Sequence, residues 1–482
     1  MNIILLSGGS GKRLWPLSND IRSKQFIKLF KDSEGNYESM VQRVYRQIKT
    51  VDPDADILIA TSKSQVSAIH NQLWNEHDQM EDGIHTEPGE QMSGDPADHM
   101  REDAHRTVSI SVEPDRRDTF PAILLAVAYM TDVLHKDPDE PVVICPVDPY
   151  VEGTYYEAVK SLASFVERDT AKITLMGIEP SYPSSKYGYI IPASMEEVAP
   201  VSSFKEKPDE ETAKGYLEQG ALWNAGVFAF RMSYLLEKAK DLLPNEGYDD
   251  LFARYSTLEK ISFDYAVLEK EPSIQVIRYR GDWKDIGTWN MISEVMADRT
   301  KGRVITDETC ENTNVVNELD IPMLVLGAKD MIIAASADGI LVSDKVRSAH
   351  MKPYVEKIGG EVHYAEKSWG TYRVIDIHHD MISHIGSMTV RVDITAGNQM
   401  KYHSHERRDE VWTILSGNGK TIVDGMEQMV RAGDVVNIAA GCRHTIIAQT
   451  DMAVIEVQVG EEINKRDKKI YPMPDVVQAI ND

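Results

Sequence analysis

The chain has 482 residues, of which 42% are hydrophobic, and its formal net charge is −25. This length allows two or three domains with substantial cores. The acidic excess argues against nucleic acid and anionic membranes as partners, and no apolar run approaches the roughly 20 residues that span a bilayer. The start MNIILLSGG is too short for a signal peptide. Cys145, Cys310 and Cys442 show no paired spacing, so we expect a reducing, cytoplasmic location.

Residues 1–295 alternate short apolar runs with amphipathic segments. The runs NIILL, DILIAT, VVICPVD, ITLMGI and AGVFAF are predicted strands, and YEAVKSLASFVER is a predicted helix. This alternation predicts an α/β domain with a Rossmann-like, mixed or mostly parallel sheet that is covered by helices.

A glycine-rich loop, SGGSGKRLWP at residues 7–16, follows the first predicted strand. It fails the Walker spacing, because Leu6 stands at the first glycine and Arg13 at the Ser or Thr, and it fails the dinucleotide spacing because Leu14 stands at the last glycine. What remains is a nest of bare backbone N–H groups that suits phosphate oxygens. The residues of this predicted phosphate site are Gly8, Gly9, Gly11, Lys12, Arg13 and, downstream, Lys24.

Residues 76–105 interrupt the α/β pattern with ten acidic residues, four histidines and one arginine. We interpret them as a solvated, flexible insertion; a metal site is the alternative.

The pattern changes after residue 300. Residues 301–360 show short β runs separated by Asp, Gly and Asn turns, followed by a helix-like VRSAHMKPYVEKI. Residues 361–482 read as many short strands with glycine turns, which predicts an all-β sandwich or barrel. We therefore predict three parts: an α/β domain at 1–300, a β-rich connection at 301–360 and an all-β domain at 361–482.

The amino-acid sequence of the glycine-rich loop resembles that of one enzyme family. LLSGGSGKRLWPLS followed by KQF resembles the nucleotide-binding signature of bacterial mannose-1-phosphate guanylyltransferases, with Ser23 where proline is usual. Further segments match in order along the first 300 residues, with Asp118 and Pro149 departing from the family pattern. These segments are EPDRRDTFPA with Asp118, CPVDPY with Asp148, KYGYI with Gly188, FKEKP with Glu206 and Lys207, LWNAGVFAF with Asn224, FDYAVLEK with Asp264, and WKDIGTW with Asp285.

The resemblance implies transfer of GMP from GTP to mannose-1-phosphate. Joining two anionic groups depends on positioning and charge neutralisation. Asp148, at a strand end, and Asp285, in an expected turn between aromatic residues, would hold Mg²⁺. Arg13 and Lys24 would neutralise the triphosphate, Lys207 would meet the sugar phosphate, and Glu206 and Asn224 the sugar hydroxyls. Taken singly, a strand-end aspartate is more often a cap or turn residue, and a Glu-Lys pair more often a solvated surface pair.

A second set of candidate ligands lies in the all-β region. GNQMKYHSHERRDEVWTILSG at 397–417 places His403 and His405 two residues apart, on one face of a strand, with Glu410 after a short turn. GDVVNIAAGCRH at 433–444 adds His444. Three imidazoles and a carboxylate suit Mn, Fe, Co, Ni or Zn, whereas a lone histidine would be an ordinary surface or core residue.

These two stretches resemble the paired motifs of the cupin superfamily, a jelly-roll barrel, with Ala439 and Ala448 replacing the usual proline and asparagine. The fusion resembles bacterial bifunctional enzymes that add a type II mannose-6-phosphate isomerase, a similarity that KSWGTY at 367–372 extends. Arg408 would hold a phosphate or stabilise charge in the isomerisation. The sequence departs from that isomerase pattern near the ligands: His403 stands at its glutamine, and Glu406, Arg407 and Val411 replace three of its histidines.

The resemblance therefore implies a bifunctional, cytoplasmic enzyme for GDP-mannose synthesis in polysaccharide production. Its substrates would be GTP, mannose-1-phosphate and mannose-6-phosphate, and a homo-oligomer, a dimer, is expected. Three alternatives stay open: a monofunctional transferase with a metal-binding cupin, a transferase for another base or sugar, and a non-catalytic nucleotide-sugar sensor.

Overall fold

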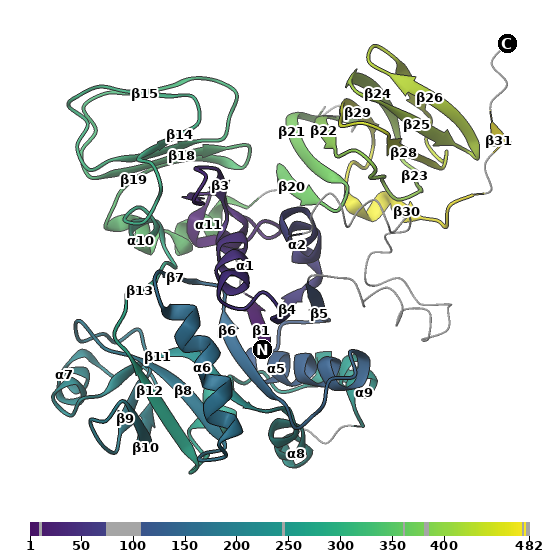
Figure 1. Ribbon diagram of the computed structural model, residues 1–482. Helices are drawn as coiled ribbons and strands as arrows, with labels where there is room; N and C mark the ends of the chain where they lie inside the picture. The colour runs from purple at the N-terminus through teal and green to yellow at the C-terminus, as the bar shows by residue number, and fades with distance from the viewer. Residues whose placement is uncertain are drawn as a thin grey trace. The chain divides into compact units, whose positions relative to one another are not determined.

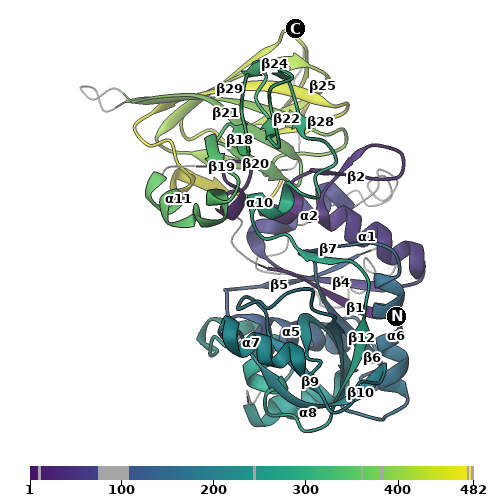
Figure 2. The same ribbon diagram turned by 90° about the vertical axis from the view of Figure 1, so that its left-hand side faces the viewer.

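The computed structural model describes residues 1–8, 12–73, 108–242, 246–359, 362–379, 385–474 and 477–478 (Figures 1 and 2). The predicted insertion at 76–105 and two of the predicted loop glycines, Gly9 and Gly11, lie outside these residues. The described residues form two compact units, one with 1–8, 25–66 and 108–297, the other with 12–24, 67–73 and 298–478. No helix in the described ranges is long and apolar enough to cross a membrane.

A nine-stranded mixed sheet forms the centre of the first unit. The strand order is β5-β4-β1-β6-β11-β8-β12-β10-β9. The half around β1 is parallel, as β5, β4, β1 and β6 run together, and β11 then enters antiparallel to both β6 and β8. Of the two predicted arrangements, the sheet is therefore the mixed one and not the mostly parallel one. The strands are β1 (Asn2–Ser7), β4 (Asp56–Ser62), β5 (Ser109–Glu113), β6 (Pro141–Pro146), β8 (Ile173–Ile178), β9 (Tyr189–Pro192), β10 (Val198–Lys205), β11 (Leu222–Arg231) and β12 (Ile274–Tyr279).

Helices cover this sheet because the central strands are apolar on both faces. All of β8 is buried, as expected for a strand inside a covered sheet. Helix α5 is apolar all round and packs inside the main core with α8 and α9, while α6 lies against β6, β8 and β11. The helices of this unit are α1 (Met40–Val51), α5 (Thr119–Ala128), α6 (Tyr155–Glu167), α7 (Glu210–Glu218), α8 (Met232–Leu242), α9 (Tyr248–Arg254) and α10 (Trp289–Ile292). Helix α2 (Val66–Leu73) belongs, except for its first residue, to the second unit.

Two short ribbons complete the first unit. Strand β2 (Phe30–Lys31) pairs with β3 (Tyr37–Glu38), just before α1. Strand β7 (Pro149–Val151) pairs antiparallel with β13 (Trp283–Asp285), and links two segments more than 130 residues apart in the sequence.

The second unit consists mainly of β-structure. A four-stranded sheet of order β14-β16-β18-β19 precedes helix α11, within the predicted helix-like stretch, and two six-stranded sheets follow, packed over a shared apolar core. The first region contains β14 (Thr300–Lys301), β15 (Val304–Thr306), β16 (Asn314–Asn317), β17 (Met323–Val325), β18 (Met331–Ser336), β19 (Gly339–Asp344) and α11 (Lys352–Ile358).

The two six-stranded sheets match the all-β expectation for residues 361–482. Their orders are β20-β21-β22-β29-β24-β27 and β30-β23-β28-β25-β26-β31. The strands are β20 (Tyr364–Lys367), β21 (Gly370–His379), β22 (Gly386–Ile394), β23 (His403–His405), β24 (Arg408–Ser416), β25 (Asn418–Val423), β26 (Met426–Arg431), β27 (Val435–Ile438), β28 (His444–Ala448), β29 (Met452–Gly460), β30 (Lys468–Ile470) and β31 (Val477–Gln478).

A buried arginine holds the segment after the glycine loop within the second unit. Arg22 donates two hydrogen bonds to Glu318, at 2.7 and 3.2 Å, and its Nε lies 3.5 Å from a carboxylate oxygen of Glu366. Its guanidinium also lies 4.9 Å from the centre of the Tyr364 ring. The segment is therefore fixed to the β-rich region by charge-assisted bonds in a desolvated setting.

We expect the substitution Arg22→Met to loosen this segment, because it leaves the carboxylates of Glu318 and Glu366 without their cation. Removing one partner from a buried ion pair costs about 3 kcal/mol or more. Amide hydrogen exchange of residues 12–24 should therefore become about a hundredfold faster. The control Lys329→Met removes an exposed ion pair with Glu311 and should change little. Unchanged exchange in Arg22→Met would contradict the anchoring role.

Candidate active sites

The first candidate site begins at the carboxyl edge of the parallel half of the sheet. Strands β1 and β6 run parallel with Leu6 opposite Pro146, and the N–H of Val147 donates to the carbonyl of Leu6 at 3.3 Å. Gly8 follows β1 and Asp148 follows β6, so both lie at the edge where ligands bind in open α/β sheets.

The ribbon of β7 and β13 brings the second predicted carboxylate to Asp148. Asp285 stands opposite Pro149 in the antiparallel register, and Pro149 directly follows Asp148. The expected turn at Asp285 is wrong, because Asp285 is the last residue of β13. This difference matters: a strand pairing sets the relative position of the two aspartates more firmly than a turn would. Mg²⁺ sites in phosphate-binding proteins commonly use one or two such carboxylates.

Four further predicted residues gather at one place in the first unit. Lys207 Nζ lies 2.6 Å from Glu206 Oε1, and the N–H of Asn224 donates to the carbonyl of Gly188 at 2.8 Å. A Cβ atom at Gly188 would lie 2.5 Å from Glu206 Oε2. A side chain at position 188 would therefore displace the Glu206 carboxylate from its present place.

Asp264 belongs to the same cluster, although the sequence motif gave it no role. Asn224 Nδ2 donates to Asp264 Oδ1 at 2.8 Å. Burial, and next the charge of Glu206, raise the pKa of Asp264 to about 6. The hydrogen bond to Glu206 raises the pKa of Lys207, whose backbone φ is +42°. A non-glycine residue in this left-handed region is typical of a functional position.

The predicted cations of the glycine loop belong to the second compact unit. Arg13 is exposed in a 3-10 turn at Lys12–Leu14, and Lys12 Nζ lies 3.2 Å from Asp20 Oδ1. Lys24 begins another 3-10 turn, Lys24–Phe26. Their action on a triphosphate stays a prediction.

The second candidate site lies between the two six-stranded sheets. His403, His405 and His444 come from β23 and β28 of one sheet, and Glu410 from β24 of the other. All four side chains are buried, and their ligand atoms lie within 4.8 Å of one another. His405 Nε2 is 3.1 Å from Glu410 Oε1, and His444 Nε2 is 3.4 Å from Glu410 Oε2. The predicted quartet is therefore assembled as a possible metal site.

The hydrogen bonds of the imidazoles orient this quartet for metal binding. Each Nδ1 faces a backbone carbonyl: that of Lys401 at 2.6 Å for His403, of Asp467 at 3.3 Å for His405, and of Cys442 at 2.9 Å for His444. The proton then sits on Nδ1, and Nε2 keeps the lone pair that a metal takes. His444 Nε2 is buried without a hydrogen-bond partner among the described residues.

Electrostatics keeps His403, His405 and Glu410 in the state that binds cations. Burial lowers the pKa of His403 to about 2 and that of His405 to about 4. Burial acts to raise the pKa of Glu410, but its close contact with His444 and the charges of its other neighbours hold the pKa well below its usual range. At neutral pH the imidazoles of His403 and His405 are therefore neutral and the carboxylate of Glu410 is ionised, as metal binding requires.

Arg408 touches two of the four ligands. Its Nε donates to Glu410 Oε1 at 3.1 Å, and its Nη2 lies 3.0 Å from His405 Nε2. The three residues that replace histidines of the isomerase pattern lie nearby in sequence, but Glu406 and Arg407 are exposed and paired with Lys469 and Glu462. Those two changes therefore fall on an outer turn and leave the ligands intact.

Two residues that support this site were given no role from the sequence. Asp467 accepts hydrogen bonds from the backbone N–H groups of Glu406 and Arg407, at 3.0 and 3.1 Å, and so holds the turn between the ligands. Its own motif, NKRDKK, carries no signal. Trp412 donates to Glu410 Oε2 at 3.3 Å, and its place two residues after a ligand on the same strand could have indicated this contact.

Two known protein families match the regions that contain these candidate sites. The nucleotidyl transferase family model matches residues 2–302, which include Gly8, Asp148 and Asp285. The chain belongs to the nucleotidyl transferase family. A cupin domain model matches residues 390–458, which hold the entire His3Glu quartet.

Individual relatives match along nearly the whole chain. Mannose-1-phosphate guanylyltransferase ManC of Salmonella typhimurium is 27% identical, covering 96% of both chains. Xanthan biosynthesis protein XanB of Xanthomonas campestris is 27% identical, also over 96% of both. Among solved structures, the one described as mannose-1-phosphate geranyltransferase from Thermus thermophilus has 24% identity and a TM-score of 0.55, and it covers 74% of this chain and 98% of that chain. That likeness supports the fold.

We expect His444→Ala to remove transition-metal binding from the all-β region. Loss of a ligand should weaken affinity by more than about 100-fold, since even the outer partners of ligands contribute about 10- to 100-fold. Metal content after dialysis against Zn²⁺ or Mn²⁺ checks this. The control His350→Ala replaces an exposed histidine outside the quartet and should bind like the parent. Equal metal content in the His444 variant would show that the quartet is not the site.

Proposed function

We propose that this chain transfers GMP from GTP to mannose-1-phosphate, releasing pyrophosphate and forming GDP-mannose. The observation that carries the proposal is the β7–β13 pairing, in which Asp285 lies opposite Pro149, the residue after Asp148, in a chain of the nucleotidyl transferase family. The choice of guanine and mannose is supported by the LWPLS sequence after the glycine loop and by the mannose-1-phosphate guanylyltransferases that match along nearly the whole chain.

In this proposal, an oxygen of the sugar phosphate attacks the α-phosphorus of GTP, and the bond to the pyrophosphate oxygen breaks. Asp148 and Asp285 would hold Mg²⁺, which supplies charge neutralisation on the phosphates when bound. Lys207 would meet the sugar phosphate, while Glu206 and Asn224 receive the sugar hydroxyls. The buried contact with Asp264 fixes the amide of Asn224 in this arrangement.

We further propose that the cupin region interconverts mannose-6-phosphate and fructose-6-phosphate. Aldose–ketose isomerisation moves a proton between neighbouring carbons through an enediolate. A divalent transition metal on His403, His405, Glu410 and His444 would supply the electrophile for that anion when bound. Arg408 would add a fixed positive charge beside two of the ligands. The retained Arg408 beside the quartet favours this over a cupin that only binds metal.

The three predicted parts, 1–300, 301–360 and 361–482, stay our proposal for how these activities are divided along the chain. We also propose that the enzyme works in the cytoplasm, where its widely spaced cysteines would stay reduced, and that it forms a homodimer.

Two variants separate the proposed activities. Asp285→Asn should lower pyrophosphate release from GTP and mannose-1-phosphate about 100-fold or more and leave isomerisation of mannose-6-phosphate unchanged. His405→Ala should do the reverse, and each variant serves as the folding control for the other. If Asp285→Asn kept full transferase activity, the role of the aspartate pair would be wrong. If the parent chain with added Mn²⁺, Co²⁺ or Zn²⁺ showed no isomerase turnover, the cupin would be an accessory metal-binding domain.

A further inference from the structure

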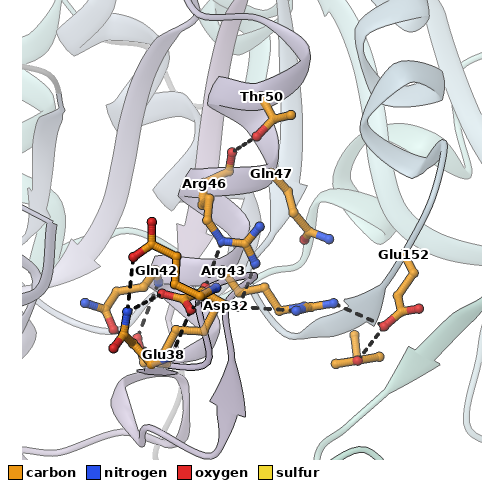
Figure 3. Close-up of polar contacts among 12 residues, drawn as sticks. Asp32, Glu38, Gln42, Arg43, Arg46, Gln47, Thr50 and Glu152 are labelled. Carbon is orange, nitrogen blue, oxygen red and sulfur yellow. Dashed lines mark hydrogen bonds and ion pairs between the residues drawn. The ribbon is translucent and has the colours of Figure 1, made fainter. Parts of the chain in front are cut away.

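Helix α1 holds strand β7 from the side, through side chains that no part of the proposed chemistry uses (Figure 3). Gln47 Nε2 donates to the carbonyl of Val151 at 3.1 Å. Arg43, one turn earlier on the helix, reaches the same strand at Tyr150 and at Glu152, the residue that follows it. The strand that begins directly after Asp148 is thus tied to a helix more than 100 residues away in sequence.

Arg43 makes the strongest of these ties. Its guanidinium carbon lies 4.6 Å from the centre of the Tyr150 ring, and its Nη2 lies 3.3 Å from Glu152 Oε1. The hydroxyl of Tyr150 donates to the same Glu152 oxygen at 2.6 Å. The cation thereby fixes both a ring and a carboxylate on one short strand segment, because a guanidinium plane combines stacking with directed hydrogen bonds.

The other guanidinium nitrogen of Arg43, Nη1, also has a carboxylate partner. Its Nη1 lies 3.2 Å from Glu38 Oε1, and Arg46 binds the same carboxylate at 2.7 and 3.0 Å. The start of α1 is fixed by a capping box in which Ser39 and Gln42 exchange hydrogen bonds. Arg43 is therefore a brace between a rigid helix start and β7.

Burial of this brace is costly, so stability alone explains it poorly. Arg43 is 8% exposed and Glu38 5% exposed, and Arg43 Nε has no hydrogen-bond partner among the described residues. A buried ion pair often contributes no more to stability than an apolar pair of similar size. What the pair does supply is a fixed position for Tyr150 and Glu152.

We propose that Arg43 is a positioning residue for the metal-binding aspartate pair. By fixing β7, it sets where Asp148 stands and where β13, whose Asp285 lies opposite Pro149, can pair. This inference rests on the proposed role of Asp148 and Asp285 in holding Mg²⁺. Arg43 acts through β7 and touches neither substrate nor cation.

The test measures the Mg²⁺ concentration that gives the half-maximal rate of pyrophosphate release from GTP and mannose-1-phosphate. Arg43→Met should raise this concentration about tenfold or more, the size seen when a partner that orients a metal ligand is lost. Arg43→Lys, which keeps the charge, should recover part of the loss. Glu152→Gln, at a side chain 56% exposed, should raise it by a smaller factor and is not expected to impair folding.

The matched control is Arg46→Met, which removes a cation from the same helix and the same carboxylate but touches no residue of β7. Its Mg²⁺ requirement should stay within about twofold of the parent. A merely structural role of Arg43 would lower the amount of active enzyme without changing the Mg²⁺ requirement, and that result for Arg43→Met or Glu152→Gln would overturn the inference.

The variant Asp285→Asn distinguishes failure of the positioning role of Arg43 from failure of the proposed metal role of Asp148 and Asp285. If Asp285→Asn changes the Mg²⁺ response and the Arg43 and Glu152 variants do not, only the positioning role fails. If Asp285→Asn leaves the Mg²⁺ response unchanged, the proposed metal role of the aspartate pair fails first.

Discussion

The antiparallel pairing of β7 with β13 is the constraint on which the first unit's proposed chemistry depends. Two carboxylates separated by 137 positions in the chain repel each other, so an unconstrained chain would keep them apart. Three strand residues on each side suffice to place Asp285 beside the segment that begins with Asp148. A cation recruited there would offset the repulsion and would meet the anionic phosphates at the same time. In the proposed function, the strand pairing thus makes the two repelling carboxylates into a binding site.

The all-β region also brings possible metal ligands from separate strands together, with a different set of side chains. Its four ligands come from both sheets of the sandwich, so packing of the apolar core also sets the distances between them. Desolvation keeps His403 and His405 neutral, and the neighbours of Glu410 keep it charged.

Much of this could be predicted from the sequence, for physical reasons that differ by element. The α/β class followed from apolar runs such as VVIC, and the quartet followed from the alternation of strand side chains, which puts His403 and His405 on one face. Gly188 was identified by resemblance alone, and the structure supplies the reason: a Cβ there would collide with Glu206. The sequence did not reveal that Asp285 lies in a strand, because a strand of three residues has no periodicity to detect. Asp467 and Arg43 were missed because their contacts link distant segments without a local pattern.

The central claim is that this chain is a nucleotidyl transferase that joins GTP to mannose-1-phosphate. The most direct measurement is pyrophosphate release, with Mg²⁺ present, from each common nucleoside triphosphate combined with mannose-1-phosphate, glucose-1-phosphate and other sugar-1-phosphates. The account predicts that GTP with mannose-1-phosphate gives the highest kcat/KM of the matrix. A higher value for another pair, or no turnover with GTP and mannose-1-phosphate, would contradict it.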